Sequence, residues 1–192
     1  MQDAKTRCPW CGTDPLYVAY HDREWGVPEH DSRALWEKLI LDGFQAGLAW
    51  ITILRKREAF RAAFDGFHPE TIARWGDAEV TRLLADPGIV RHRGKIEAAI
   101  ASARAYLAVQ ERMPFADYLW RHLDGQPLQN NFATLGEIPT ETELSRRISR
   151  DLKSDGFKFC GPTITYAFLQ ATGLVNDHLT SCHRHKALSP PP

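Results

Sequence analysis

Two cysteines and two histidines lie near opposite ends of the chain with spacings that suit a metal ion. Cys8 and His21 lie near the start, and His178 and Cys182 lie near the end. Residues four apart on a helix or tight turn face the same side, so His178 and Cys182 can bind one ion together. Two thiolates and two imidazoles complete a tetrahedral structural zinc site. Such a site would join the N-terminal segment to the C-terminal one.

A rival set of ligands uses the same region of the sequence. Cys8 and Cys11 form a Cys-x-x-Cys pair, and His183 and His185 follow closely behind the last cysteine. In this set Cys11 could take the place of His21. A lone cysteine or histidine is more often a core or surface residue, but the grouping of both types at both chain ends favours a metal.

Cysteine usage and the N-terminal residues both point to the cytoplasm. No apolar segment follows Met1, which argues against a secretory signal peptide. Cytoplasmic thiols stay reduced, so the four cysteines favour metal binding or burial over disulfides. We expect the isolated Cys160 to be a small buried residue. The apolar runs are too short to cross a bilayer, and no membrane partner is expected.

The first 50 residues contain five large aromatic residues that could line a pocket: Trp10, Tyr17, Tyr20, Trp25 and Trp50. Aromatic residues usually pack in a core, but the segment that carries the first three has no helical or strand period of its own. Flat rings on a loop suit an extruded nucleobase, whose stacking contributes ~1 to 3 kcal/mol per base. A cationic base gains further from cation–π attraction.

Asp42 has an unusual position for a carboxylate. At helical spacing it lies between Leu35, Leu39 and Ala46, at the edge of an apolar arc. Burial of a carboxylate is costly without a partner, so an inward Asp42 indicates a functional role. The alternative is an outward side chain that pairs with Lys38, four residues earlier.

Helical period dominates the sequence from Asp31 onward, and no stretch shows the alternation of apolar and polar residues that is typical of a strand. Helices must therefore position the candidate site residues. The pattern predicts an all-α fold, with residues 1–188 as one domain and 189–192 as a loose tail. Helices are expected at 31–46, 52–64, a short one from Pro69, one capped by Asp77 that ends before Pro87, then 93–111, 115–123, 140–153 with a Thr140–Glu143 capping box, and 163–172. An irregular connection is expected at 124–139.

Composition is that of an ordinary globular protein, with 43% hydrophobic and 25% charged residues. The net charge of zero argues against a nucleic-acid partner, because such proteins are usually basic. Basic residues nevertheless cluster at 55–61, 91–95 and 146–153. Each cluster alone is most simply a solvated helix face.

Long stretches of the chain resemble the DNA-3-methyladenine glycosylase I family of the helix-hairpin-helix superfamily. The matching stretches are residues 14–17, 20–28, 45–52, 88–96, 156–159 and 173–178. They include Tyr-His-Asp-Arg-Glu-Trp-Gly-Val-Pro and Gln-Ala-Gly-Leu-Ala-Trp-Ile-Thr, occur in the family's order and cover nearly the whole chain. The resemblance implies a helix-hairpin-helix glycosylase fold whose terminal segments are joined by zinc.

Carried over residue by residue, the resemblance selects one metal-ligand set and outlines a base pocket. It implies one structural Zn²⁺ per chain on Cys8, His21, His178 and Cys182, and Cys11 has no counterpart. It places Tyr17, Tyr20, Trp25 and Trp50 in the base pocket with Trp10 close by. The family's pocket carboxylate falls on Asp42, where the best-known members carry glutamate. The residues expected to act in catalysis are Asp42, Tyr20 and Trp50.

The turn at 86–89 is the expected DNA-gripping hairpin, with Gly88 permitting positive φ. Backbone N–H groups at the next helix start would hold a phosphate, and Arg91, Arg93 and Lys95 would reinforce them. A local anion site of this kind reconciles DNA binding with zero net charge. The resemblance also places Gln45, Gly47 and Leu48 against the duplex, with Leu48 as a wedge.

The implied reaction is hydrolysis of the N-glycosidic bond of 3-methyladenine in double-stranded DNA, which releases the free base and leaves an abasic site. Asp117 and Lys95 are expected to be a surface acid and a phosphate contact, so no strand-cleaving lyase activity is expected, and the chain is expected to be a monomer. Two alternatives stay open. One is a zinc-stabilised module that binds DNA damage without cutting, and the other is a zinc hydrolase with an open coordination position.

Overall fold

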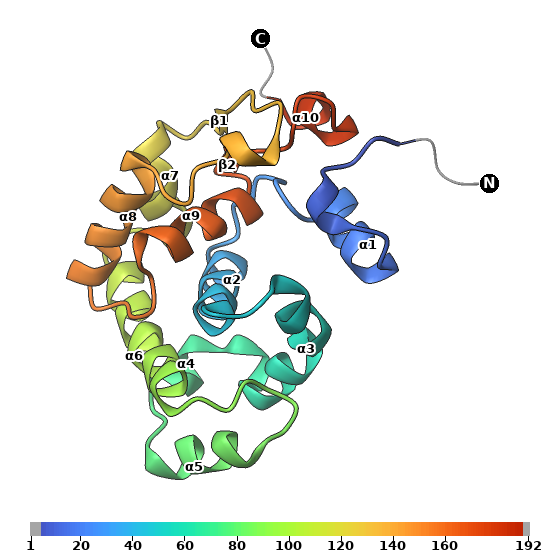
Figure 1. Ribbon diagram of the computed structural model, residues 1–192. Helices are drawn as coiled ribbons and strands as arrows, with labels where there is room; N and C mark the ends of the chain where they lie inside the picture. The colour runs from blue at the N-terminus through green and yellow to red at the C-terminus, as the bar shows by residue number, and fades with distance from the viewer. Residues whose placement is uncertain (1–4, 190–192) are drawn as a thin grey trace.

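The computed structural model describes residues 5–189, and helices dominate this range (Figure 1). The α-helices are α1 Pro15–Arg23, α2 Ser32–Gln45, α3 Trp50–Ala63, α4 Pro69–Ile72, α5 Asp77–Ala85, α6 Arg93–Gln110, α7 Phe115–Trp120, α8 Glu143–Ser154, α9 Pro162–Ala171 and α10 His183–Ala187. The expected mostly helical fold is confirmed. Of the predicted tail at 189–192, all but Ser189 lies outside the described residues.

Helix starts follow from local capping. The Asp31 side chain accepts a hydrogen bond from the Ala34 amide at 2.7 Å, as expected for the start of α2. Two expected caps were misplaced. The N-cap of α5 is Gly76 rather than Asp77, and α8 begins after Thr142, which exchanges hydrogen bonds with Ser145.

Helix α1 was not expected, and it carries two of the aromatic residues that were assigned to a loop. Asp14 caps it by accepting hydrogen bonds from the amides of Leu16 and Tyr17, and Pro15 occupies the first helical position. Only Tyr20 and His21 are buried in α1. Two buried residues in nine are too few to give the sequence a visible helical period.

A two-residue parallel pair of strands was also not expected. β1 Leu128–Gln129 lies beside β2 Val175–Asn176, with Leu128 opposite Val175. This pairing fastens the irregular connection between α7 and α8 to the segment that leads into the C-terminal cysteine. The two strands lie far apart in the sequence, so no local pattern predicts their pairing.

Helix α2 lies at the centre of the molecule, where it contacts α3, α6, α7 and α9 (Figure 1). Its side chains Leu35, Trp36 and Phe44 are fully buried in one large apolar core. Because so much of α2 is covered, a polar side chain on it must either find a partner or face an internal cavity.

Gly173 holds the chain after α1 against the end of α9. Its φ is +71°, and a Cβ built there would lie 2.3 Å from the Pro28 nitrogen. Only glycine allows this approach. Across residues 5–189, no helix has the length and apolar character needed to cross a membrane.

Candidate metal centre and base pocket

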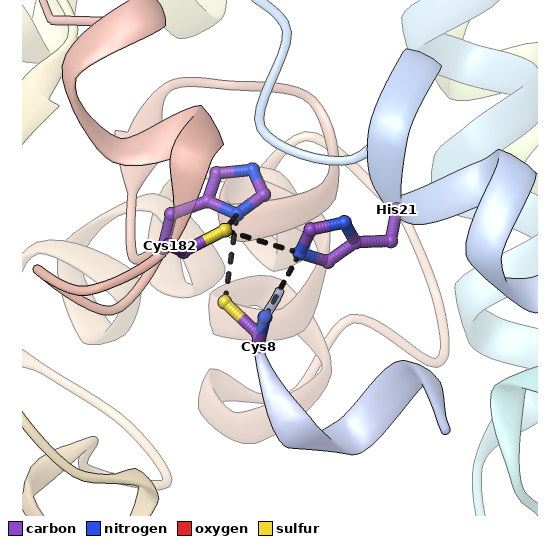
Figure 2. Close-up of side chains that lie close together, drawn as sticks. Cys8, His21 and Cys182 are labelled. Atoms are coloured by element: carbon purple, nitrogen blue, oxygen red, sulfur yellow. Dashed lines mark hydrogen bonds between the residues drawn. The ribbon is translucent and has the colours of Figure 1, made fainter. Parts of the chain in front are cut away.

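Four buried side chains from opposite ends of the chain converge near the N-terminal segment and α10. The donor atoms of Cys8, His21, His178 and Cys182 all lie within 4.8 Å of one another. Figure 2 shows the side chains of Cys8, His21 and Cys182 pointing toward one another. Cys182 Sγ lies 3.4 Å from His21 Nε2 and 3.5 Å from His178 Nδ1, and Cys8 Sγ lies 3.5 Å from His178 Nδ1. Four donors around one point can hold a metal ion.

The outward-facing ring nitrogens of both histidines have partners of their own. His21 Nδ1 lies 2.8 Å from Asp22 Oδ1, and His178 Nε2 lies 3.0 Å from the Trp25 carbonyl oxygen. The Asp22 carboxylate accepts hydrogen bonds from the Arg7 guanidinium. Such partners fix the tautomer and orientation of a metal-binding imidazole.

Both sulfur atoms accept backbone hydrogen bonds, and the environment of Cys182 favours its thiolate form. The Leu179 amide donates to Cys8 Sγ at 3.4 Å, and the Arg184 amide donates to Cys182 Sγ at 3.5 Å. Hydrogen bonds with Cys8, His178 and His21 lower the pKa of Cys182.

The rival ligand set is not brought together. Cys11 is buried, but its thiol donates to the Cys8 carbonyl oxygen at 3.2 Å. His185 Nε2 lies 2.9 Å from the Asn130 carbonyl oxygen, outside the cluster. The geometry therefore favours His21 over Cys11.

The predicted aromatic residues line one cavity of about 200 Å³ between α1, α2, α3 and α9. Tyr20 and Trp50 lie with ring centroids 5.6 Å apart, and Trp10 packs against Trp25 at 5.0 Å. The residues that line the cavity are Trp10, Tyr17, Tyr20, Trp25, Lys38, Asp42, Gln45, Trp50, Ile138, Ala167, Gln170 and Ala171.

Asp42 is buried on the cavity side of α2, and it also pairs with Lys38. Its relative exposure is 2%, and its Oδ1 atom accepts a hydrogen bond from Lys38 Nζ at 2.5 Å. Its Oδ2 atom is buried with no partner among the described residues. Burial raises the pKa of Asp42, and the charge of Lys38 opposes that shift. The sequence left open whether Asp42 faces inward or pairs with Lys38. Both are true, because the ion pair itself faces inward.

A second cavity, of about 270 Å³, lies on the other side of Lys38. It shares Tyr20, Lys38 and Ala171 with the aromatic cavity, and its charged lining residues include Glu24 and Glu37. Glu24 is paired with Arg57, and Glu37 with Arg61. The Lys38 side chain therefore forms part of the wall between an aromatic cavity and a charged one.

The segment after α2 places the predicted wedge beside the aromatic cavity. The Gln45 side chain lines the cavity and donates to the Leu48 carbonyl oxygen at 3.2 Å. Gly47 has a φ of +83°, and Leu48 is 40% exposed. An exposed leucine at the edge of the cavity could enter a gap in a base stack.

The turn between α5 and α6 differs in two ways from what was expected. Gly88 does not have positive φ; a Cβ there would instead lie 2.9 Å from Asp86 Oδ1, the atom that accepts its amide hydrogen bond. Lys95 is 8% exposed, and its ammonium donates to the carbonyl oxygens of Phe44 and Ala46 at 2.8 and 2.6 Å. It caps the end of α2 and does not present its charge to a phosphate.

The other basic side chains are mostly in ion pairs or hydrogen bonds. Arg93 pairs with Glu97 at 3.2 Å, and Arg91 is exposed beside it. Lys56 donates to the carbonyl oxygens of Pro87 and Gly88, which braces the turn from α3.

Two polar residues of the aromatic cavity were missed from the sequence as pocket residues. Lys38 was considered only as an outward partner of Asp42. Gln170 lies on α9, and its amide donates to Asp177 Oδ2 at 2.8 Å. The i to i+4 spacing of Lys38 and Asp42 could have indicated that the two share a face. Gln170 had no such signal, because it reaches the cavity only through packing of α9 on α2.

Comparisons with known proteins agree with this geometry. The family model for methyladenine glycosylases matches residues 10–185. DNA-3-methyladenine glycosylase 1 of Escherichia coli strain K12 is 53% identical over 177 residues, which cover 92% of this chain and 95% of that protein. A crystal structure of 3-methyladenine DNA glycosylase I superposes with a TM-score of 0.92 at 55% identity, covering 94% of this chain and 100% of the other.

A second solved structure is a variant of 3-methyladenine DNA glycosylase I in complex with 3-methyladenine. It has a TM-score of 0.90 at 38% identity and covers 93% of this chain and 97% of that one. The fold, the pocket and these matches agree with the resemblance seen in the sequence. The chain belongs to the methyladenine glycosylase family.

Proposed function

We propose that this protein removes 3-methyladenine from DNA by hydrolysing the N-glycosidic bond. The observation that carries the proposal is a cavity with aromatic walls in which Asp42 Oδ2 is buried and lacks a partner. A buried carboxylate oxygen without a donor is costly, and a bound base with an amino group would satisfy it. A relative of known structure holds 3-methyladenine.

In the proposed mechanism the enzyme recognises and positions a base that is already a good leaving group. Methylation at N3 makes the base of the nucleotide cationic. Tyr20 and Trp50 would stack against it, and Asp42 would accept a hydrogen bond from its N6 amino group. The carboxylate then favours the charged base, and the stacking holds the glycosidic bond in place for water.

We assign extrusion of the base from duplex DNA to the segment after α2 and to the α5–α6 turn, which we propose as the helix-hairpin-helix element. Leu48 would fill the space that the base leaves, and Gly47 allows the tight turn that presents it. The Gly88 region and the exposed Arg91 and Arg93 would face the phosphates. Action as a cytoplasmic monomer on double-stranded DNA stays a prediction.

We propose Zn²⁺ as the ion of the Cys8, His21, His178 and Cys182 cluster. A tetrahedral zinc with ordinary bond lengths has sulfur-to-nitrogen edges of ~3.6 Å, and the sulfur-to-nitrogen distances quoted above are 3.4 and 3.5 Å. Four protein donors fill the shell, so the role is structural and a hydrolytic zinc with an open position is disfavoured.

The proposed reaction is tested by chromatography of the bases released from DNA treated with a methylating agent. We expect 3-methyladenine in the soluble fraction, with the DNA strand left intact. Binding of methylated DNA without release of any base would instead support the alternative of a damage-binding module.

Strand cleavage at the abasic site is expected to be absent. A lyase needs a lysine amine that is free to attack the sugar, and the Lys95 ammonium is held by two carbonyl oxygens. Borohydride added to the protein with abasic DNA should trap no covalent adduct. An adduct that disappears in Lys95→Ala would show that this lysine leaves its carbonyl partners and reacts.

A further inference from the structure

The Lys38 ammonium makes both contacts that a cationic base would need in the aromatic cavity. Its Nζ atom lies 2.5 Å from Asp42 Oδ1 and 3.8 Å from the centroid of the Trp50 ring. The first contact is a charge-assisted hydrogen bond, and the second is a cation–π interaction. The pocket without a base therefore already contains a cation.

Lys38 depends on Asp42 to remain charged in this position. The Lys38 side chain is 16% exposed. Within residues 5–189, Asp42 is the only residue to which it donates a hydrogen bond. Burial lowers the pKa of Lys38, and the Asp42 carboxylate opposes this shift. Each of the two residues thus compensates the charge of the other.

We propose that Lys38 is a positioning residue that acts as a resident counter-ion, keeping Asp42 ionised in the empty pocket and leaving Trp50 when a cationic base enters. The inference rests on the proposed function, since it assigns a role at the same site. It follows from geometry, because Lys38 and Trp50 line one cavity and a base stacked on Trp50 there would compete with the ammonium. Two positive charges in contact with one carboxylate would also repel each other.

The second cavity can accommodate the Lys38 ammonium after a base displaces it. Lys38 lines both cavities, so rotation of its flexible side chain carries Nζ from one to the other. The lining of the second cavity has carboxylates from Glu24, Glu29 and Glu37 and guanidinium groups from Arg23, Arg57 and Arg61, so these charges balance without Lys38. A carboxylate of this cavity, such as that of Glu24 or Glu37, could accept a hydrogen bond from the ammonium after it leaves Trp50.

The need to displace Lys38 weakens base binding, because the apparent dissociation constant equals the intrinsic one divided by the fraction of molecules whose site is open. If only about a tenth of the molecules have an open site, the apparent dissociation constant is about tenfold larger than the intrinsic one. A variant without the ammonium should therefore bind the base about tenfold more tightly than the parent.

The direct test follows the Lys38 ε-methylene group by NMR with ¹³C-labelled lysine. The probe is 3,9-dimethyladeninium, a fragment of the damaged nucleotide whose charge is fixed because N3 and N9 are both alkylated. In the free protein the ring current of Trp50 should shift the Lys38 resonance upfield, and saturation with the probe should return it to the position of an ordinary lysine. An upfield resonance that persists at saturation would overturn the proposal.

Binding by variants gives an independent measurement. Lys38→Met and the smaller Lys38→Ala should bind 3,9-dimethyladeninium about tenfold more tightly than the parent, at a pH high enough to keep Asp42 ionised. Lys153→Met, which changes an exposed lysine on α8, is the matched control and should bind as the parent does.

Unchanged or weaker binding in both Lys38 variants would contradict the displacement. This outcome is distinct from failure of the proposed function. If the chain did not act on 3-methyladenine, neither the parent nor any variant would bind the probe or release a base from methylated DNA.

Discussion

Asp42→Asn should slow excision of 3-methyladenine by about ten- to a hundredfold. The asparagine keeps the size of the side chain but removes the charge that favours a cationic base, and it cannot accept hydrogen bonds at both terminal atoms. Hydrogen bonds to charged groups contribute about 1.5 to 3 kcal/mol, which corresponds to this range of rates. The measurement is the single-turnover rate of base release from methylated DNA.

Three comparisons separate a loss of recognition from a loss of folding. Asp42→Asn leaves the Lys38 ammonium without its carboxylate, so thermal melts should accompany the rates, and a protein that also carries Lys38→Met removes the unpaired charge. Asp117→Asn changes an exposed carboxylate on α7 and should retain the parent rate. Asp42→Glu restores the carboxylate one methylene further out and should keep most activity. A parent-like rate in Asp42→Asn would remove Asp42 from the site.

Cys182→Ser should abolish stoichiometric zinc and lower the melting temperature by about 10 to 20 °C. Cys182 contacts both histidines of the cluster, so its loss opens the coordination shell. Metal-binding free energy at such sites is largely folding free energy, and a loss of about 5 kcal/mol in a chain of this length corresponds to that shift. Metal analysis and calorimetry of the purified protein give both values.

Cys11→Ser is the matched control for this effect, because Cys11 is also buried and also near the N-terminus but lies outside the cluster. It should retain one equivalent of zinc. Loss of zinc from Cys11→Ser together with retention in Cys182→Ser would reverse the assignment of ligands. Chelation of the parent should lower the melting temperature in the same direction as Cys182→Ser.

The helices that the sequence predicts best are those that bury a broad apolar face. Helix α2 is one, since Leu35, Trp36 and Leu39 recur at helical spacing. Helix α1 was missed because only Tyr20 and His21 of its nine residues are buried, which is too few to give a helical period. Asp14 followed by Pro15 was nevertheless a start signal of the kind that opens a helix.

The site was predicted in its residue types and less well in its geometry. The cavity gathers the expected aromatic residues and Asp42, but Gln170 and Ile138 come from distant segments that only tertiary packing brings near. Lys95 belongs to a basic cluster in the sequence, but its ammonium donates hydrogen bonds to carbonyl oxygens at the end of α2. A count of local charges cannot reveal such a partner, because the two segments are 49 and 51 residues apart.

The claim that the aromatic cavity is the base site is tested most directly by the six tryptophan indole N–H resonances during titration with 3-methyladenine. Trp10, Trp25 and Trp50 line the cavity, whereas Trp36, Trp75 and Trp120 do not. The resonances of the first three should shift to saturation, with the largest change at Trp50, whose Nε1 is buried without a partner among the described residues. The other three should stay in place as internal controls. Saturable binding that leaves Trp10, Trp25 and Trp50 unmoved would contradict the account.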